Sequence, residues 1–270
     1  MLRPPTDNLS IKLFDPVIDE SSIHRALSHP NPHLLKDGGS RTVWKSALSD
    51  NSPVIIKCRA KSSLSFLRMS ISRSPLQNEL RGLRALASLN ILASKPIAYI
   101  RAADSEAIVL SYISGPTLLE LISWHPLTIT QEKALCRALA TQIRAVLRAS
   151  HFNRDNKPSN LIVTGDFTNP SIAIIDAAGI QSSFGHTFAL RLMLASLYIE
   201  PYGCKNTIRN ALCMRMLHAV VLELGASSQD ARRDARNLWR VVQNQIEYHG
   251  DPVPRHLPMI IPSPEISRPD

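Results

Sequence analysis

Hydrophobic positions follow a two-residue period over residues 33–60 and a period of three to four residues over much of the remaining chain. Within 33–60, a glycine pair precedes alternating positions from Thr42, a turn-forming run at 49–53 and the β-branched run Val54–Ile56. This pattern predicts antiparallel strands joined by tight turns. Residues 1–32 show no sustained period, and we expect them to be an irregular lead-in.

A helix is predicted after these strands. Ser74 lies three residues before Gln77, with Pro75 between them, which is the spacing of an N-terminal capping box. An apolar stripe at helical spacing follows, formed by Leu76, Leu80, Leu83 and Ala87. Glu79 lies at the margin of that stripe and can therefore face the interior.

Two more strands and a helical second half complete the predicted organisation. Apolar runs at 95–100 and 106–113 predict the strands, and the turn residues that follow end the first lobe. We predict an N-terminal lobe at 33–113 and a C-terminal lobe at 114–249. The helices expected in the second lobe cover residues 130–150, 187–199, 206–224 and 228–248. Six prolines within 250–270 predict an extended tail.

The net charge of the chain indicates which classes of partner it attracts. Lys and Arg total 31 against 22 Asp and Glu, so the net charge of +9 favours anionic partners. Residues 57–84 hold seven basic residues and a single acid, Glu79. Aromatic residues make up only 5% and are not interleaved with the basic ones, so no nucleic-acid partner is expected.

Hydropathy and cysteine spacing bear on the compartment. No apolar run approaches the roughly 18 residues of a membrane span, and the first residues lack the apolar segment of a secretory signal. The cytoplasm is therefore the expected location. The cysteines lack CxxC spacing and are expected to be buried thiols; they are Cys58, Cys136, Cys204 and Cys213.

The most specific chemical pattern lies at residues 155–160. Asp155 is followed by Lys157 and Asn160, and an apolar strand begins at once. A phosphoryl-transfer site requires this set, because the acid orients or deprotonates a hydroxyl, the lysine lies near the transferred phosphoryl and the asparagine oxygen holds Mg²⁺. A second apolar strand at 172–175 ends at Asp176, which could reach the same metal.

These two segments resemble the catalytic loop and the metal-binding loop of the protein-kinase-like fold. The first half of the chain has matching parts, because Lys57 follows the strand run Val54–Ile56 and Glu79 lies on the next predicted helix. The resemblance implies that Lys57 holds the α- and β-phosphates of ATP and that Glu79 fixes its ammonium group.

The same resemblance implies a site for the nucleotide. Gly38, Gly39 and Ser40 stand where the turn that covers the phosphates is expected. Leu110 and Tyr112, at the end of the strand before the lobe boundary, are implied to contact the nucleotide. We therefore expect an α+β, bilobal protein-kinase-like fold. It has a small antiparallel β-rich N-terminal lobe with one key helix and a reduced, mainly helical C-terminal lobe.

Among branches of this fold, the chain looks most like the bacterial lipopolysaccharide kinases, which phosphorylate core sugars such as Kdo or heptose. The resembling pieces are 38–45, the helix phrase 78–86, the catalytic loop and the short C-terminal lobe. This likeness implies an ATP- and Mg²⁺-dependent kinase that acts on a hydroxyl of a sugar or glycolipid. A peripheral contact of the basic segment with the anionic inner face of the membrane is a further expectation.

Two other functions stay open at this point. The Lys157–Pro158 pair is more typical of Ser/Thr protein kinases, although no Ala-Pro-Glu triplet follows Asp176. The usual His-Arg-Asp and Asp-Phe-Gly triplets are altered by Asn153 and Ala177. These two changes favour a pseudokinase, which would serve as a nucleotide-binding or interaction module.

Overall fold

The N-terminal lobe is a six-stranded antiparallel sheet with one helix on its outer face. The computed structural model describes residues 2–61, 74–183, 185–200, 208–225 and 227–249. The strand order is β1-β5-β6-β4-β3-β2, and each neighbouring pair is antiparallel. The strands are β1 (Ser10–Leu13), β2 (His33–Asp37), β3 (Arg41–Ala47), β4 (Pro53–Ala60), β5 (Pro96–Arg101) and β6 (Ser105–Ser111).

The expected irregular lead-in at 1–32 is wrong. Strand β1 pairs with β5, and helix α1 (Glu20–Leu27) begins at an N-cap formed by Asp19. Ile23, on α1, is fully buried in a cluster with apolar side chains of the sheet. Both elements are short, and β1 is only half-buried on one side, so neither produces a sustained hydrophobic period.

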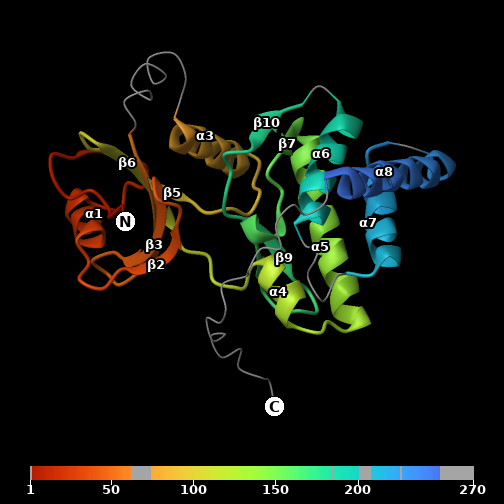
Figure 1. The fold of residues 1–270 in the computed structure, drawn as a ribbon, viewed down its shortest axis with the longest axis horizontal. Helices are drawn as coiled ribbons and strands as arrows, with labels where there is room; N and C mark the ends of the chain where they lie inside the picture. Colours follow the sequence, from red (N-terminus) through yellow and green to blue (C-terminus); the bar gives the residue numbers. More distant parts are fainter. Residues whose placement is uncertain (1, 62–73, 184, 201–207, 226, 250–270) are drawn as a thin grey trace.

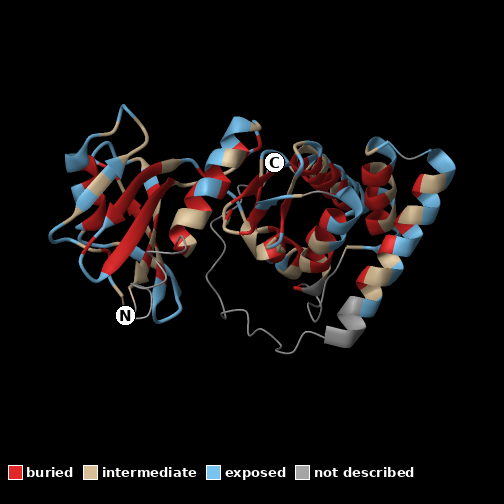
Figure 2. Ribbon diagram, turned by 90° about the horizontal axis from the view of Figure 1, so that it is seen from above, coloured by how far each residue is buried: buried red, intermediate tan, exposed pale blue. Residues whose placement is uncertain are grey.

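Alternation along the strands gives the sheet two distinct faces. The outer face packs with α1 in one cluster, which includes Trp44, Val54, Ile56, Cys58, Ile100 and Val109. The inner face carries the alternate residues and faces helix α3 and the C-terminal lobe, because Tyr99, Ile108 and Leu110 belong to the second, larger cluster. Strands β5 and β6 are therefore mostly buried, whereas β3 and β4 alternate between buried and half-buried residues (Figure 2).

The predicted helix after the strands is α3 (Pro75–Ser88). The capping box of Ser74 and Gln77 forms as expected, with both reciprocal hydrogen bonds present. The cap is also tied to the sheet, because the Ser74 hydroxyl donates to Glu106 Oε2 at 2.8 Å. Tyr99 donates to the same carboxylate oxygen at 2.6 Å. This buried network fixes the start of α3 against β5 and β6.

The C-terminal lobe is mainly helical and lies on the other side of α3 (Figure 1). Its helices are α4 (Leu118–Trp124), α5 (Ile129–Arg148), α6 (His186–Ile199), α7 (Asn210–Glu223) and α8 (Ser228–His249). Its strands are β7 (His151–Asn153), β8 (Leu161–Thr164), β9 (Ser171–Ile174) and β10 (Ile180–Ser182), and the short 3₁₀ turn η1 (Pro158–Asn160) precedes β8. The mixed α+β class and the two-lobe arrangement are confirmed, whereas α4, β7 and β10 were not predicted.

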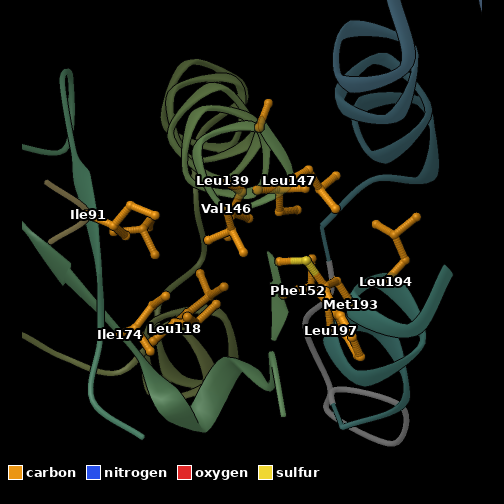
Figure 3. Packing of buried hydrophobic residues seen from close by; sticks show 14 of the residues in the cluster. Ile91, Leu118, Leu139, Val146, Leu147, Phe152, Ile174, Met193, Leu194 and Leu197 are labelled. Carbon is orange, nitrogen blue, oxygen red and sulfur yellow. The ribbon is translucent and has the colours of Figure 1, made fainter. Parts of the chain in front are cut away.

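The core of this lobe is built around α5. Leu139, Val146 and Leu147 project from α5 toward Phe152 of β7 and toward Met193 and Leu197 of α6 (Figure 3). Phe152 precedes Asp155 by three residues, so the packing of β7 against α5 anchors the start of the predicted catalytic loop.

Three of the four cysteines lie among the described residues, and all three are buried. Cys58, Cys136 and Cys213 are buried free thiols, and burial raises their pKa values to about 12, 12 and 11. Cys204 and the 250–270 tail lie outside the described residues.

Within the described part of the chain, no helix has the length and apolar character that crossing a membrane requires.

Candidate active site

Lys57 lies on the inner face of β4, where it joins three elements. Its ammonium group is paired with the buried carboxylate of Glu79 on α3. It also donates to the carbonyl oxygen of Ile175 at 2.8 Å, directly before Asp176. The predicted lysine and glutamate are therefore brought together, and they meet the segment that carries Asp176.

Two carboxylates, those of Glu79 and Asp176, influence the ammonium group of Lys57. Burial lowers the pKa of Lys57, but the carboxylates of Glu79 and Asp176 outweigh it and raise this pKa above its usual value. Burial raises the pKa of Glu79; Lys57 opposes the rise and Asp176 adds to it. Lys57 therefore stays charged at neutral pH, paired with Glu79 and within electrostatic reach of Asp176.

The predicted catalytic loop is held by its own backbone and amide bonds. The Asp155 N–H donates to Asn153 Oδ1 at 3.1 Å, and Asn160 Nδ2 donates to the Asp155 carbonyl at 3.1 Å. The carboxylate of Asp155 lies 3.3 Å from Lys157 Nζ, and both side chains are about one-third exposed. Asp155 and Lys157 can thus reach a substrate from a fixed loop.

Asn153 acts as a loop anchor in place of the usual histidine. It is fully buried, and its side-chain oxygen holds the Asp155 amide. Next to it, Asn156 is also fully buried, and its amide nitrogen and oxygen have no partner among the described residues. The side chain of Asn153 therefore supports the loop through a hydrogen bond from the buried interior.

Asn160 and Asp176 lie at the same end of the β8–β9 hairpin. Ile175 N–H donates to the Asn160 carbonyl at 3.0 Å, which places the two candidate metal ligands side by side. One carboxylate oxygen of Asp176 accepts from the Ala178 N–H at 3.1 Å. Among the described residues no donor is bonded to the Asn160 amide oxygen, so that oxygen is free to bind a metal.

These donors fit Mg²⁺. No group of three or more His, Cys, Asp or Glu side chains suited to a metal occurs in the described part of the chain. Mg²⁺ does not need one, because it keeps several waters and binds through one or two carboxylates and the phosphates of a substrate. The carboxylate of Asp176 and the amide oxygen of Asn160 meet that requirement.

The glycine turn connects two neighbouring strands of the sheet. Gly38–Ser40 join β2 to β3, with Gly39 at a φ of +71° and its N–H bonded to Asp37 Oδ1 at 2.9 Å. Tyr112, just beyond β6, lies under the ammonium group of Lys45, 4.0 Å from its ring centre. Leu110 is buried on the inner face. Contacts of these residues with a nucleotide stay a prediction.

Two glycines allow the close contacts on which the site depends. A Cβ at Gly82 of α3 would overlap the carbonyl oxygen of Ala177, so only glycine lets α3 approach the metal loop. A Cβ at Gly179 would lie 2.7 Å from the Asp155 backbone nitrogen. Ala177, whose carbonyl oxygen Gly82 approaches, is itself fully buried. Sequence reasoning missed both glycines because nothing local marks such an approach.

Glu200 is a further residue that the sequence did not reveal. It lies just after α6, and its two carboxylate oxygens accept from the backbone N–H and the hydroxyl of Ser159, at 2.7 and 2.6 Å. Ser196 of α6 adds a bond to the Arg154 carbonyl at 2.5 Å. The sequence holds one related signal. Ser159, within the predicted catalytic-loop motif, carries a hydroxyl and an N–H that need a hydrogen-bond acceptor.

We expect Glu200→Gln to loosen the catalytic loop. An amide oxygen replaces a bidentate carboxylate, and bonds to a charged acceptor contribute about 1.5–3 kcal/mol. The Ser159 amide should exchange its hydrogen at least about tenfold faster, measured by native-state exchange and mass spectrometry. Glu20→Gln, at an exposed position of α1, is the matched control. Unchanged protection of Ser159 in Glu200→Gln would contradict a positioning role.

The basic residues within 57–84 lie in different parts of the structure. Lys57 belongs to the site, while Arg81 and Arg84 are exposed on α3. Arg84 stacks over the Phe14 ring at 4.4 Å. Arg68 and Arg73 lie outside the described residues. The expected membrane contact of this segment therefore stays a prediction.

A cavity of about 470 Å³ lies away from these residues. It is bordered by the loop after α3, by α5 and by the β8–β9 turn, and its walls include Leu92, Arg137 and Asn169. Gln142 also lines it, and its amide atoms have no partner among the described residues. None of the predicted site residues borders this cavity.

Together these elements define the fold. A five-element core of sheet, helix, catalytic loop, hairpin and metal loop converges on the Lys57–Glu79 pair. The arrangement is a mixed α+β fold of two lobes, consistent with the expected kinase-like fold. No protein-family model matches the chain, and no curated protein matches it. Among solved structures, an apo pseudokinase has a TM-score of 0.49 and 12% identity, over 84% of this chain and 94% of that chain.

Proposed function

We propose that this kinase-like chain is a Mg²⁺- and ATP-dependent kinase that transfers the γ-phosphoryl group to a sugar hydroxyl. The acceptor is an anionic glycan of the lipopolysaccharide-core type. The observation that carries the proposal is the convergence on one place of Lys57, Glu79 and Asp176 with the loop of Asp155 and Asn160. An ion pair that only stabilises the fold would not need an accessible acid, Asp155, and an unbonded amide oxygen, of Asn160, beside it.

Each residue has a defined task in this reaction. Lys57 binds the α- and β-phosphates, and Glu79 keeps its ammonium group oriented. Asp155 orients the acceptor hydroxyl and takes its proton at a carboxylate oxygen. Lys157, 3.3 Å from that carboxylate, stabilises negative charge on the phosphoryl group during transfer. Asn160 and Asp176 would hold Mg²⁺, which neutralises phosphate charge.

The choice of a sugar over a protein acceptor rests on the likeness to lipopolysaccharide kinases and on the reduced C-terminal lobe. The described helices after Asp176 are α6, α7 and α8. The net charge of +9 favours an acidic acceptor. The Lys157–Pro158 pair and the changes at Asn153 and Ala177 keep a Ser/Thr protein kinase and a pseudokinase as alternatives for the same site.

Transfer from γ-labelled ATP with Mg²⁺ tests the proposal. The acceptors are a Kdo- and heptose-containing core oligosaccharide, a total envelope glycolipid extract and casein. Label on the oligosaccharide or glycolipid supports a sugar kinase, and label on casein alone supports a protein kinase. Nucleotide binding without transfer would indicate a pseudokinase. If the protein neither transfers phosphate nor binds nucleotide, the kinase proposal is overturned.

A further inference from the structure

A pair of arginines lies next to Lys57 on the inner face of the sheet. Arg41 is the first residue of β3 after the glycine turn, and it is directly opposite Arg59 of β4. The burial pattern places both on one face, because Thr42, Trp44, Ile56 and Cys58 between and beside them are buried on the outer face. Lys57 and Val43 form the next cross-strand pair on the same inner face.

Two like charges directly opposite in an antiparallel pair destabilise a sheet. Among the described residues, neither Arg41 nor Arg59 has a carboxylate within ion-pair distance. The acid opposite Arg59 on its other side, Glu106, is turned to α3, where Ser74 and Tyr99 donate to one of its oxygens. Burial and the nearby Arg41 lower the pKa of Arg59, while Glu106 raises it less. Two guanidinium groups therefore face one acid, Glu106, that is not in ion-pair contact with either of them among the described residues.

The position of the pair relates it to the proposed nucleotide site. Arg59 is two residues from Lys57 on one strand, a Cα separation of about 7 Å. Both arginines adjoin the Gly38–Ser40 turn, because Ala60 N–H donates to the Ser40 carbonyl at 3.0 Å. An anion bound to Lys57 and extended toward the turn would meet both guanidinium groups. Guanidinium groups form paired hydrogen bonds with phosphate oxygens.

We propose that Arg41 and Arg59 form a phosphate-binding pair that takes the terminal phosphate of the nucleotide or a phosphate carried by the acceptor. The pair lies beyond the phosphates assigned to Lys57 and under the glycine turn. This proposal rests on the proposed function only for the identity of the ligand. The two facing arginines are a feature of the sheet whether or not the protein is a kinase. The ligand class is a phosphate monoester or the end of a polyphosphate.

The test uses the double variant Arg41→Gln/Arg59→Gln of the full chain. Calorimetry with Mg²⁺ compares ADP with a non-hydrolysable ATP analogue, and thermal unfolding is followed with and without inorganic phosphate. Arg25→Gln/Arg232→Gln is the control with the same charge change, because Arg25 and Arg232 are exposed on α1 and α8. Without ligand, the double variant should unfold at the same or a higher temperature than the wild type, since a like-charge pair is removed.

The outcomes separate the two sources of phosphate. A loss of at least about tenfold in affinity for the ATP analogue, with ADP within twofold, assigns the pair to the terminal phosphate. Unchanged nucleotide affinity with loss of phosphate-induced stabilisation assigns it to the acceptor. Equal losses for both nucleotides would overturn the proposal, as would a double variant that matches the wild type with all three ligands.

Failure of the proposed function is distinguishable from failure of this pair. If the wild type binds neither nucleotide, the kinase proposal fails, but the phosphate measurement still decides on the arginines. A phosphate-dependent rise in unfolding temperature that the double variant loses and the control keeps would support them. No such rise in the wild type would then overturn the pair.

Discussion

Asp155→Ala is expected to lower phosphoryl transfer by about 10²–10⁴-fold, the range for loss of a general base, with nucleotide binding unchanged. The side chain is about one-third exposed, so its removal leaves no buried cavity. The bonds that hold the loop use the Asp155 backbone N–H and carbonyl, which alanine retains. Lys57, Glu79 and Asp176 should therefore bind the nucleotide as before.

The measurement is a comparison of kcat with the dissociation constant of an ATP analogue. Asp155→Asn is the matched variant, because it keeps the shape of the side chain and removes only its capacity to accept a proton at neutral pH. Both variants should lose transfer to a similar extent. Transfer within twofold of the wild type in either variant would refute the role of Asp155 as base.

Gly82→Ala is expected to damage both stability and nucleotide binding. The new Cβ would overlap the carbonyl oxygen of Ala177, so α3 and the metal loop must separate. Glu79 precedes Gly82 by less than one turn of α3, and its pairing with Lys57 should weaken as the helix moves. We expect a loss of about 1–3 kcal/mol in the free energy of unfolding and at least about tenfold weaker Mg²⁺-nucleotide binding.

The expected loss of stability is opposite in sign to the effect of helix propensity. Alanine is the better helix former by about 1 kcal/mol, so without the contact the substitution would stabilise the protein. Gly185→Ala, at the N-cap of α6, is a control for the added methyl group alone, because a Cβ there meets no atom within 4 Å among the described residues. Denaturant unfolding and calorimetry check both variants. A stabilised Gly82→Ala with normal nucleotide affinity would show that α3 need not approach the metal loop closely.

The sequence predicts the parts of the site that local pattern encodes. The capping box at Ser74 and the helical stripe that includes Leu83 predict α3 and the inward direction of Glu79, because both signals lie within a few residues. The alternation in β4 predicts the strand that carries Lys57. The apolar runs that flank the turn after Thr164 likewise predict the β8–β9 hairpin.

The remaining features depend on long-range contact, which one sequence does not show. Glu200 meets Ser159 across 41 residues. Gly82 touches Ala177 only because α3 folds onto the other lobe. Strand β1 is defined by its pairing with β5, far along the chain, and its own four residues resemble any half-exposed segment. These features arise from tertiary packing, which overrides weak local preference.

The most direct test of the central claim is calorimetric titration of a non-hydrolysable ATP analogue, with and without Mg²⁺, into the wild type and into Asp176→Ala. The claim is that Lys57 and the Asn160–Asp176 pair together bind a metal-nucleotide complex. The account predicts that Mg²⁺ tightens binding to the wild type by at least about tenfold. It predicts little or no effect of Mg²⁺ in Asp176→Ala. Binding that is indifferent to Mg²⁺ in the wild type, or equally Mg²⁺-dependent in both proteins, would contradict it.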